Sequence, residues 1–140
     1  MTPRGELHHV ELWIEDLDAA ESSWAWLLDE LGYTRFQTWA TGQSWLRGAT
    51  YIVLEASPAV RRQGHDRLRP GVNHLAFTGG RRDEVDDLVA RASGRGWSLM
   101  FADAHPYAGG PDHYAAYLEN ADGFEVEIVA DDEHPVTYGT

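Results

Sequence analysis

The sequence contains no cysteine and no lysine, and all 11 of its basic residues are arginine. The absence of cysteine excludes a disulfide scaffold, a cysteine nucleophile and a zinc site made of thiolates. No apolar run approaches the roughly 18 residues of a membrane span, and the N-terminal residues 1–6 lack the apolar stretch of a signal peptide. We therefore expect a cytoplasmic protein with no membrane partner.

Positive charge is scarce as well. The 11 Arg against 23 Asp plus Glu give 11 − 23 = −12. Such an acidic chain is a poor partner for nucleic acid, because binding to phosphates needs a basic surface. The chain of 140 residues is long enough for one domain with a real core. Its 6 Trp and 6 Tyr are more informative, because they provide stacking surfaces.

The chain contains two similar segments, at residues 7–33 and 72–97. Each begins with a short strand of alternating apolar and polar residues and continues into a helix that ends at a Gly-aromatic pair. We predict one helix that starts near Asp16 or Asp18, and a second with an apolar face formed by Val85, Leu88, Val89 and Ala92. The predicted strands cover residues 7–14, 33–38, 44–47, 50–56, 73–78, 98–101, 113–119 and 124–130.

This order predicts one domain over residues 1–140, made of two modules, 6–57 and 71–131. Residues 58–70 carry four arginines between two prolines, and we interpret them as a solvated linker. Residues 102–112 form a long loop rich in Gly and Pro, which either closes over a ligand or is a plain surface hairpin. In each module one helix covers one sheet face and leaves the other face for a partner or ligand.

Strand parity places several metal-binding residue types on the faces opposite the apolar residues. His9 and His74 occupy equivalent positions in the two repeats, and Glu127 alternates with Val126 and Ile128. Two imidazoles and one carboxylate can form a facial triad for a divalent metal. Glu55 is a fourth candidate, although Val53 shares its face. The donor set suits Ni, Zn, Co, Mn or Fe(II) without choosing among them.

Four motifs in order resemble the vicinal oxygen chelate superfamily, which includes glyoxalase I, bleomycin resistance proteins and extradiol dioxygenases. They are the strand at residues 8–17, the Leu-Gly-Tyr at 31–33, the strand at 73–77 and the Asp-Gly hairpin with its strand at 120–128. The resemblance implies an α+β fold in which two βαβββ modules form a half-open mixed β-barrel or cup flanked by helices. It also implies His9, His74, Glu127 and, least securely, Glu55 as ligands of one divalent metal ion.

The resemblance further implies a metal-dependent enzyme, either a glyoxalase-like lyase or isomerase or an extradiol-type dioxygenase, acting on a small substrate with vicinal oxygens. Glu127 and Glu55 would be its catalytic carboxylates. We expect a homodimer, because two half-covered sheets are costly to expose. The alternative is a metal-free, bleomycin-resistance-like protein that sequesters a cationic aromatic drug. The expected substrate-binding residues are Glu11, Trp13, Tyr51, His113 and Tyr117.

Overall fold

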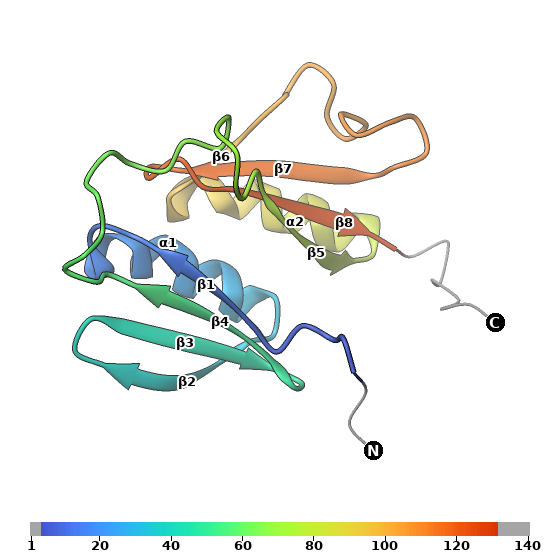
Figure 1. The fold of residues 1–140 in the computed structure, drawn as a ribbon. Helices are drawn as coiled ribbons and strands as arrows, with labels where there is room; N and C mark the ends of the chain where they lie inside the picture. Colours follow the sequence, from blue (N-terminus) through green and yellow to red (C-terminus); the bar gives the residue numbers. More distant parts are fainter. Residues whose placement is uncertain (1–3, 132–140) are drawn as a thin grey trace. The chain divides into compact units, whose positions relative to one another are not determined.

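A computed structural model describes residues 4–131 of the chain, which forms two compact units that divide after Gly64. Each unit contains one long helix and one four-stranded mixed sheet (Figure 1). The strand-helix-strand-strand-strand order occurs in both units. The α+β class and the repeat predicted from the sequence are therefore confirmed. Within residues 4–131 each unit has its own four-stranded sheet, and neither sheet closes into a barrel.

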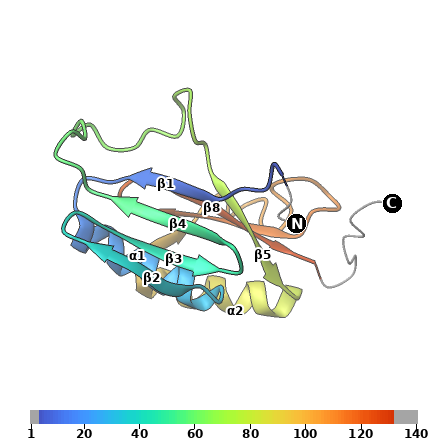
Figure 2. The same ribbon diagram turned by 60° about the horizontal axis from the view of Figure 1, so that its bottom comes forward.

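The first unit has the sheet order β1-β4-β3-β2, in which β1 and β4 run parallel and the other neighbours antiparallel. Helix α1 lies along one face of this sheet (Figure 2) and contacts β4. The elements are β1 (His9–Trp13), α1 (Leu17–Glu30), β2 (Thr34–Trp39), β3 (Gly42–Arg47) and β4 (Thr50–Glu55).

The second unit repeats this arrangement with the order β5-β8-β7-β6, in which β5 and β8 are the parallel pair. Helix α2 packs against all four of these strands. The elements are β5 (Leu75–Gly80), α2 (Arg82–Ala92), the short 3-10 helix η1 (Ser93–Arg95), β6 (Trp97–Leu99), β7 (Ala115–Asn120) and β8 (Glu125–Ala130). Strand β5 thus begins two residues later than predicted, and His74 is the residue just before it.

Local sequence signals explain the limits of helix α1. The Asp16 side chain accepts a hydrogen bond from the Ala19 amide, so Asp16 is the N-cap and Asp18 lies in the first turn. Of the two starts predicted for this helix, near Asp16 or Asp18, the structure therefore confirms Asp16. Gly32 follows the helix with φ of +86°, a conformation that favours glycine. Ala20, Trp24, Leu27 and Leu28 form the buried face of this helix, and Trp24 is completely inaccessible to solvent.

Residue parity in the strands decides which side chains leave the core. In β1, Leu12 is buried, whereas His9, Glu11 and Trp13 are exposed. In β8, Val126 and Ile128 are fully buried, and the alternating carboxylates point to the opposite face of the sheet. That face is not open, however, because Glu125 and Glu127 are only 4% and 6% exposed. The expectation of an uncovered face is wrong at these two positions.

The segment between β6 and β7 is irregular, as the Gly and Pro content of residues 102–112 predicts. Tyr114 ends this segment and fixes it to helix α2, because its hydroxyl donates a 2.6 Å hydrogen bond to Asp86. The Arg82 guanidinium lies over the same ring, 4.8 Å from its centre. None of the helices within residues 4–131 is long and apolar enough to cross a membrane.

The Tyr114–Asp86 hydrogen bond predicts a pH-dependent stability. Hydrogen bonding to Asp86, then burial and the Asp86 charge, raise the pKa of Tyr114 to about 12 from 10.0. Since the folded state favours the protonated phenol, its contribution is complete below about pH 10 and is lost as the pH rises towards about 12. Tyr114→Phe should lower the free energy of unfolding near neutral pH, and its difference from wild type should shrink over that range in urea titrations. A difference that does not vary with pH would contradict this assignment.

Candidate functional site

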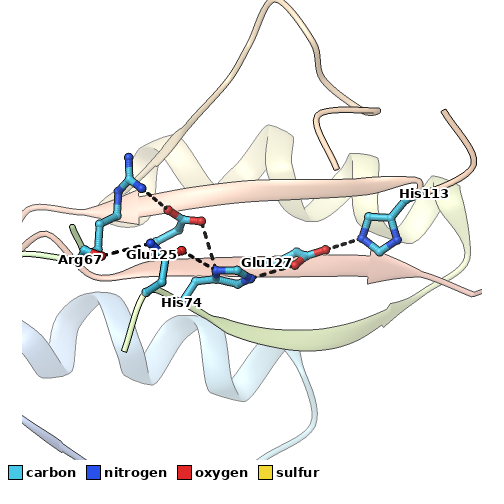
Figure 3. A network of polar contacts seen from close by, with 6 residues as sticks. Arg67, His74, His113, Glu125 and Glu127 are labelled. Atoms are coloured by element: carbon cyan, nitrogen blue, oxygen red, sulfur yellow. Dashed lines mark hydrogen bonds and ion pairs between the residues drawn. The ribbon is translucent and has the colours of Figure 1, made fainter. Parts of the chain in front are cut away.

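The second unit brings together two of the predicted metal ligands, His74 and Glu127. The parallel register of β5 with β8 pairs Leu75 with Val126 and Ala76 with Glu127, so His74 lies at the start of this pairing. His74 Nε2 is 3.1 Å from Glu127 Oε1 (Figure 3). This contact between residues 53 positions apart results from the crossover of the βαβββ module, which places the first and last strands side by side.

Residues of strand β7 and of the loop before it lie beside the second carboxylate oxygen of Glu127. His113 Nε2 contacts Glu127 Oε2, and Tyr117 is the register partner of Glu127. Burial, followed by the charge of Glu127 and a hydrogen bond to it, raises the pKa of Tyr117. The strand pattern alone left open which face His113 and Tyr117 occupy. The structure places both on the face of Glu127.

A second buried carboxylate, Glu125, lies on the other side of His74. Its Oε2 is 3.6 Å from His74 Nδ1, and its Oε1 forms an ion pair with the Arg67 guanidinium at 3.2 Å. Arg67 belongs to the segment interpreted from the sequence as a solvated linker, and its side chain is only 25% exposed. Sequence reasoning missed both roles. The available signals were two acids on one strand face and an arginine-rich segment near the start of the same module.

The side-chain oxygen of Asn73 faces Nδ1 of His74. Its amide nitrogen donates to the Arg67 carbonyl at 3.1 Å, which fixes the amide orientation. Asn73 Oδ1 then lies 2.7 Å from His74 Nδ1, and an amide oxygen can only accept. His74 Nδ1 is therefore the donor. In the neutral ring, Nε2 then presents a lone pair to the Glu127 carboxylate, and two acceptors at this distance need a proton or a cation between them.

The loop between β6 and β7 packs closely against this cluster at Gly109. A Cβ atom at this position would lie 2.6 Å from the Tyr117 hydroxyl oxygen and 2.7 Å from His113 Cδ2. Both distances are too short for a side chain, so the loop contacts the cluster through bare backbone. The sequence left open whether this loop covers a ligand or is a plain surface hairpin. In the structure the loop contacts two candidate site residues, His113 and Tyr117.

The first unit carries the other predicted site residues on one sheet face. The His9 ring stacks on Tyr51 with centroids 4.8 Å apart and planes at 4°, and Phe36 lies 5.5 Å from Tyr51. Trp13 Nε1 donates a 2.7 Å hydrogen bond to Glu11. Tyr51, Glu11 and Trp13, predicted to contact substrate, therefore share an aromatic and acidic surface with His9.

The structure does not bring Glu55 together with His9. In the parallel register of β1 with β4, His9 pairs with Tyr51 and Trp13 pairs with Glu55. Four residues of strand separate the two, which is about 13 Å. Both Glu55 oxygens also accept hydrogen bonds of 2.6 Å, one from Trp39 and one from Thr41.

Comparing the two registers identifies the equivalent of Glu127 in the first unit. Glu127 pairs with the residue two positions after His74, and Val53 pairs with the residue two positions after His9. Val53, not Glu55, therefore occupies the corresponding position. Glu55, the fourth ligand candidate from the sequence, therefore does not stand at the position equivalent to Glu127.

The donor chemistry of the second unit fits a divalent metal at His74 and Glu127. Two neighbouring ligands with bonds of about 2.1 Å to one ion lie about 3.0–3.4 Å apart, and His74 Nε2 and Glu127 Oε1 are 3.1 Å apart. Among residues 4–131 no group of three or more His, Asp or Glu side chains is arranged around one such point. The described cluster therefore offers a two-ligand half-site.

Comparisons with known proteins agree with this fold. The chain matches the family model of the glyoxalase/bleomycin resistance protein/dioxygenase superfamily over residues 8–117. It is 38% identical to the uncharacterized protein YqjT of Bacillus subtilis (strain 168) over 125 residues, which cover 89% of this chain and 98% of that one.

Solved structures give the same result. A crystal structure of a proposed glyoxalase from Bacillus halodurans has a TM-score of 0.85 and 41% identity, covering 91% of this chain and 96% of that one. Lactoylglutathione lyase from Agrobacterium tumefaciens has a TM-score of 0.60 at 20% identity, covering 92% and 96%, which shows likeness of fold alone. The chain belongs to the glyoxalase/bleomycin resistance protein/dioxygenase superfamily.

Proposed function

We propose that this protein is a divalent-metal-dependent enzyme of its superfamily, acting on a small substrate with two neighbouring oxygens. The observation that carries the proposal is the contact of 3.1 Å between His74 Nε2 and Glu127 Oε1, two groups that both present lone pairs when the ring is neutral. Such an arrangement is typical of ligands that await a cation. The reaction is of the lyase or isomerase type or of the extradiol dioxygenase type.

His74 Nε2 and Glu127 Oε1 would hold the ion in this proposal, and the ion would act as a Lewis acid towards the substrate oxygens. The surrounding residues keep both ligands in place. Asn73 holds the His74 ring through Nδ1, and His113 holds the Glu127 carboxylate through Oε2. Partners of this kind orient metal ligands in many proteins.

Glu127 also has a route for protons. Its Oε2 contacts His113, whose side chain is 41% exposed, whereas the Glu127 side chain is only 8% exposed. A proton taken from one substrate carbon by Glu127 would pass to His113 Nε2, and a proton returned along the same path would reach the adjacent carbon. A carboxylate coupled to an exposed imidazole in this way suits proton transfer between adjacent carbons.

Metal binding tests the proposal directly. Wild-type protein without an affinity tag should bind one divalent ion per chain in titrations with Ni²⁺, Zn²⁺, Mn²⁺ or Fe²⁺ under anaerobic conditions. His74→Ala and Glu127→Gln should each weaken binding at least about tenfold, because even partners of the ligands have effects of this size. His9→Ala tests the third ligand expected from the sequence in the same titration.

Two variants serve as controls for that titration. His105→Ala removes an imidazole from the loop before β7, and Glu55→Gln changes a carboxylate that already accepts two hydrogen bonds. Both should bind metal as wild type does. Failure of wild-type protein to bind any of the four ions would overturn the proposal.

A second function is favoured by one observation in the first unit. Its sheet face combines stacked His9 and Tyr51, the half-exposed Phe36, and Trp13, which is 46% exposed beside Glu11. Aromatic faces with nearby carboxylates bind planar cations through stacking and cation–π contacts. The net charge of −12 would attract such a ligand. We therefore propose metal-free sequestration of a cationic aromatic drug as the alternative.

Binding of bleomycin in the presence of a chelator separates the two functions. If the alternative is right, metal-free protein binds the drug, and the affinity falls steeply with salt because the attraction is electrostatic. Phe36→Ala should weaken binding, whereas Phe101→Ala should not, although both rings are 48% exposed. No binding by calorimetry, or equal effects of the two substitutions, would exclude this alternative.

A further inference from the structure

Glu125 is a buried carboxylate that the proposed metal chemistry does not use as a ligand. Its side chain is 3% exposed, and Oε1 accepts no hydrogen bond within the part of the chain that the structure describes. Burying a carboxylate costs free energy unless charged partners compensate. An apolar residue at this strand position would avoid the cost. We therefore look for a role of the Glu125 carboxylate that an apolar side chain could not perform.

Arg67 is linked to His74 in two ways, one through Glu125 and the other through Asn73. Figure 3 shows the first of these links. The Arg67 guanidinium holds Glu125 at 3.2 Å, and Glu125 Oε2 lies 3.6 Å from His74 Nδ1. The Arg67 carbonyl also accepts the 3.1 Å hydrogen bond from Asn73, whose oxygen faces the same Nδ1 at 2.7 Å. Arg67 therefore contacts both groups that surround Nδ1.

We propose that Arg67, Asn73 and Glu125 are positioning residues, which keep the proton of His74 on Nδ1 and aim Nε2 at Glu127. The inference rests on the proposed function where it concerns metal affinity. A carboxylate or carbonyl on the far nitrogen of a ligating histidine fixes the tautomer and strengthens the ligand. The segment between the two modules thus contributes directly to the site.

A purely structural role is the competing explanation. In that case the Arg67–Glu125 ion pair only attaches the segment of residues 65–73 to β8, and its loss changes stability alone. The two explanations differ in their effect on the ring of His74. Positioning predicts a change in the tautomer and in metal affinity, neither of which a simple attachment would alter in a protein that remains folded.

The test compares three variants with one matched control. Glu125→Gln, Arg67→Gln and Asn73→Leu should each weaken Zn²⁺ binding ten- to hundredfold in calorimetric titrations, with one ion per chain still bound at saturation. Arg69→Gln lies two residues from Arg67 and loses only an ion pair with the exposed Asp66, so it should bind Zn²⁺ as wild type does. Thermal unfolding of each variant identifies those that are folded at the titration temperature.

The tautomer is measured on metal-free protein, so it does not depend on the proposed function. Long-range ¹H–¹⁵N spectra in mildly alkaline buffer should show His74 protonated on Nδ1 in wild type, with its signals identified by their loss in His74→Ala. Asn73→Leu should shift the ring towards the Nε2-protonated form. Arg69→Gln should leave it unchanged.

Each outcome decides one of the two claims. If wild type binds Zn²⁺ and the three variants bind equally well, the positioning role is wrong and the proposed function stands. If wild type binds no metal, the proposed function falls, and an unaltered tautomer in Asn73→Leu would then overturn the positioning role as well. Should Glu125→Gln not fold, Arg67→Gln and Asn73→Leu decide the question, because both alter more exposed side chains.

Discussion

The burial of two carboxylates on one face of strand β8 is the constraint on which the candidate site depends. Glu125 and Glu127 are both almost inaccessible to solvent, and an ionised carboxylate in such a place needs charged or hydrogen-bonding partners. The partners come from two separate parts of the second unit. Arg67 and His74 approach from the chain before β5, and His113 approaches from the loop before β7.

This requirement gives the irregular segments of the second unit a defined role. The chain around residue 67 would be a simple connection if Glu125 were apolar, and the loop before β7 would have no charged group to meet at Glu127. Gly109 shows how closely that loop approaches, since its backbone leaves no room for a Cβ beside His113. Both irregular segments therefore supply partners to the buried carboxylates of one strand.

Much of the fold could be predicted from the sequence, because it depends on local patterns. The signals involved lie within a few residues of one another. They are the alternation in β1 and β8, the apolar faces of both helices, and the glycines that follow the helices. The equivalence of His9 and His74 came from the same source. The partners of Glu125 could not be predicted, because the ion pair joins Arg67 to a strand 58 residues later. Such a contact follows from the crossover and leaves no periodic signal.

The register between strands could not be predicted from the sequence either, because residue parity shows only which face of a strand a side chain occupies. Parity places Glu55 and Val53 on the same face of β4, and only the pairing with β1 shows that Val53 corresponds to Glu127. Within each unit the histidine position is retained, but the carboxylate positions are filled by Tyr51 and Val53 in the first unit and by Glu125 and Glu127 in the second. The two units therefore share a strand order but carry different side chains at the positions around the histidine. The first sheet carries a histidine on an aromatic face. The second carries a histidine between two buried carboxylates, one of which forms an ion pair with Arg67.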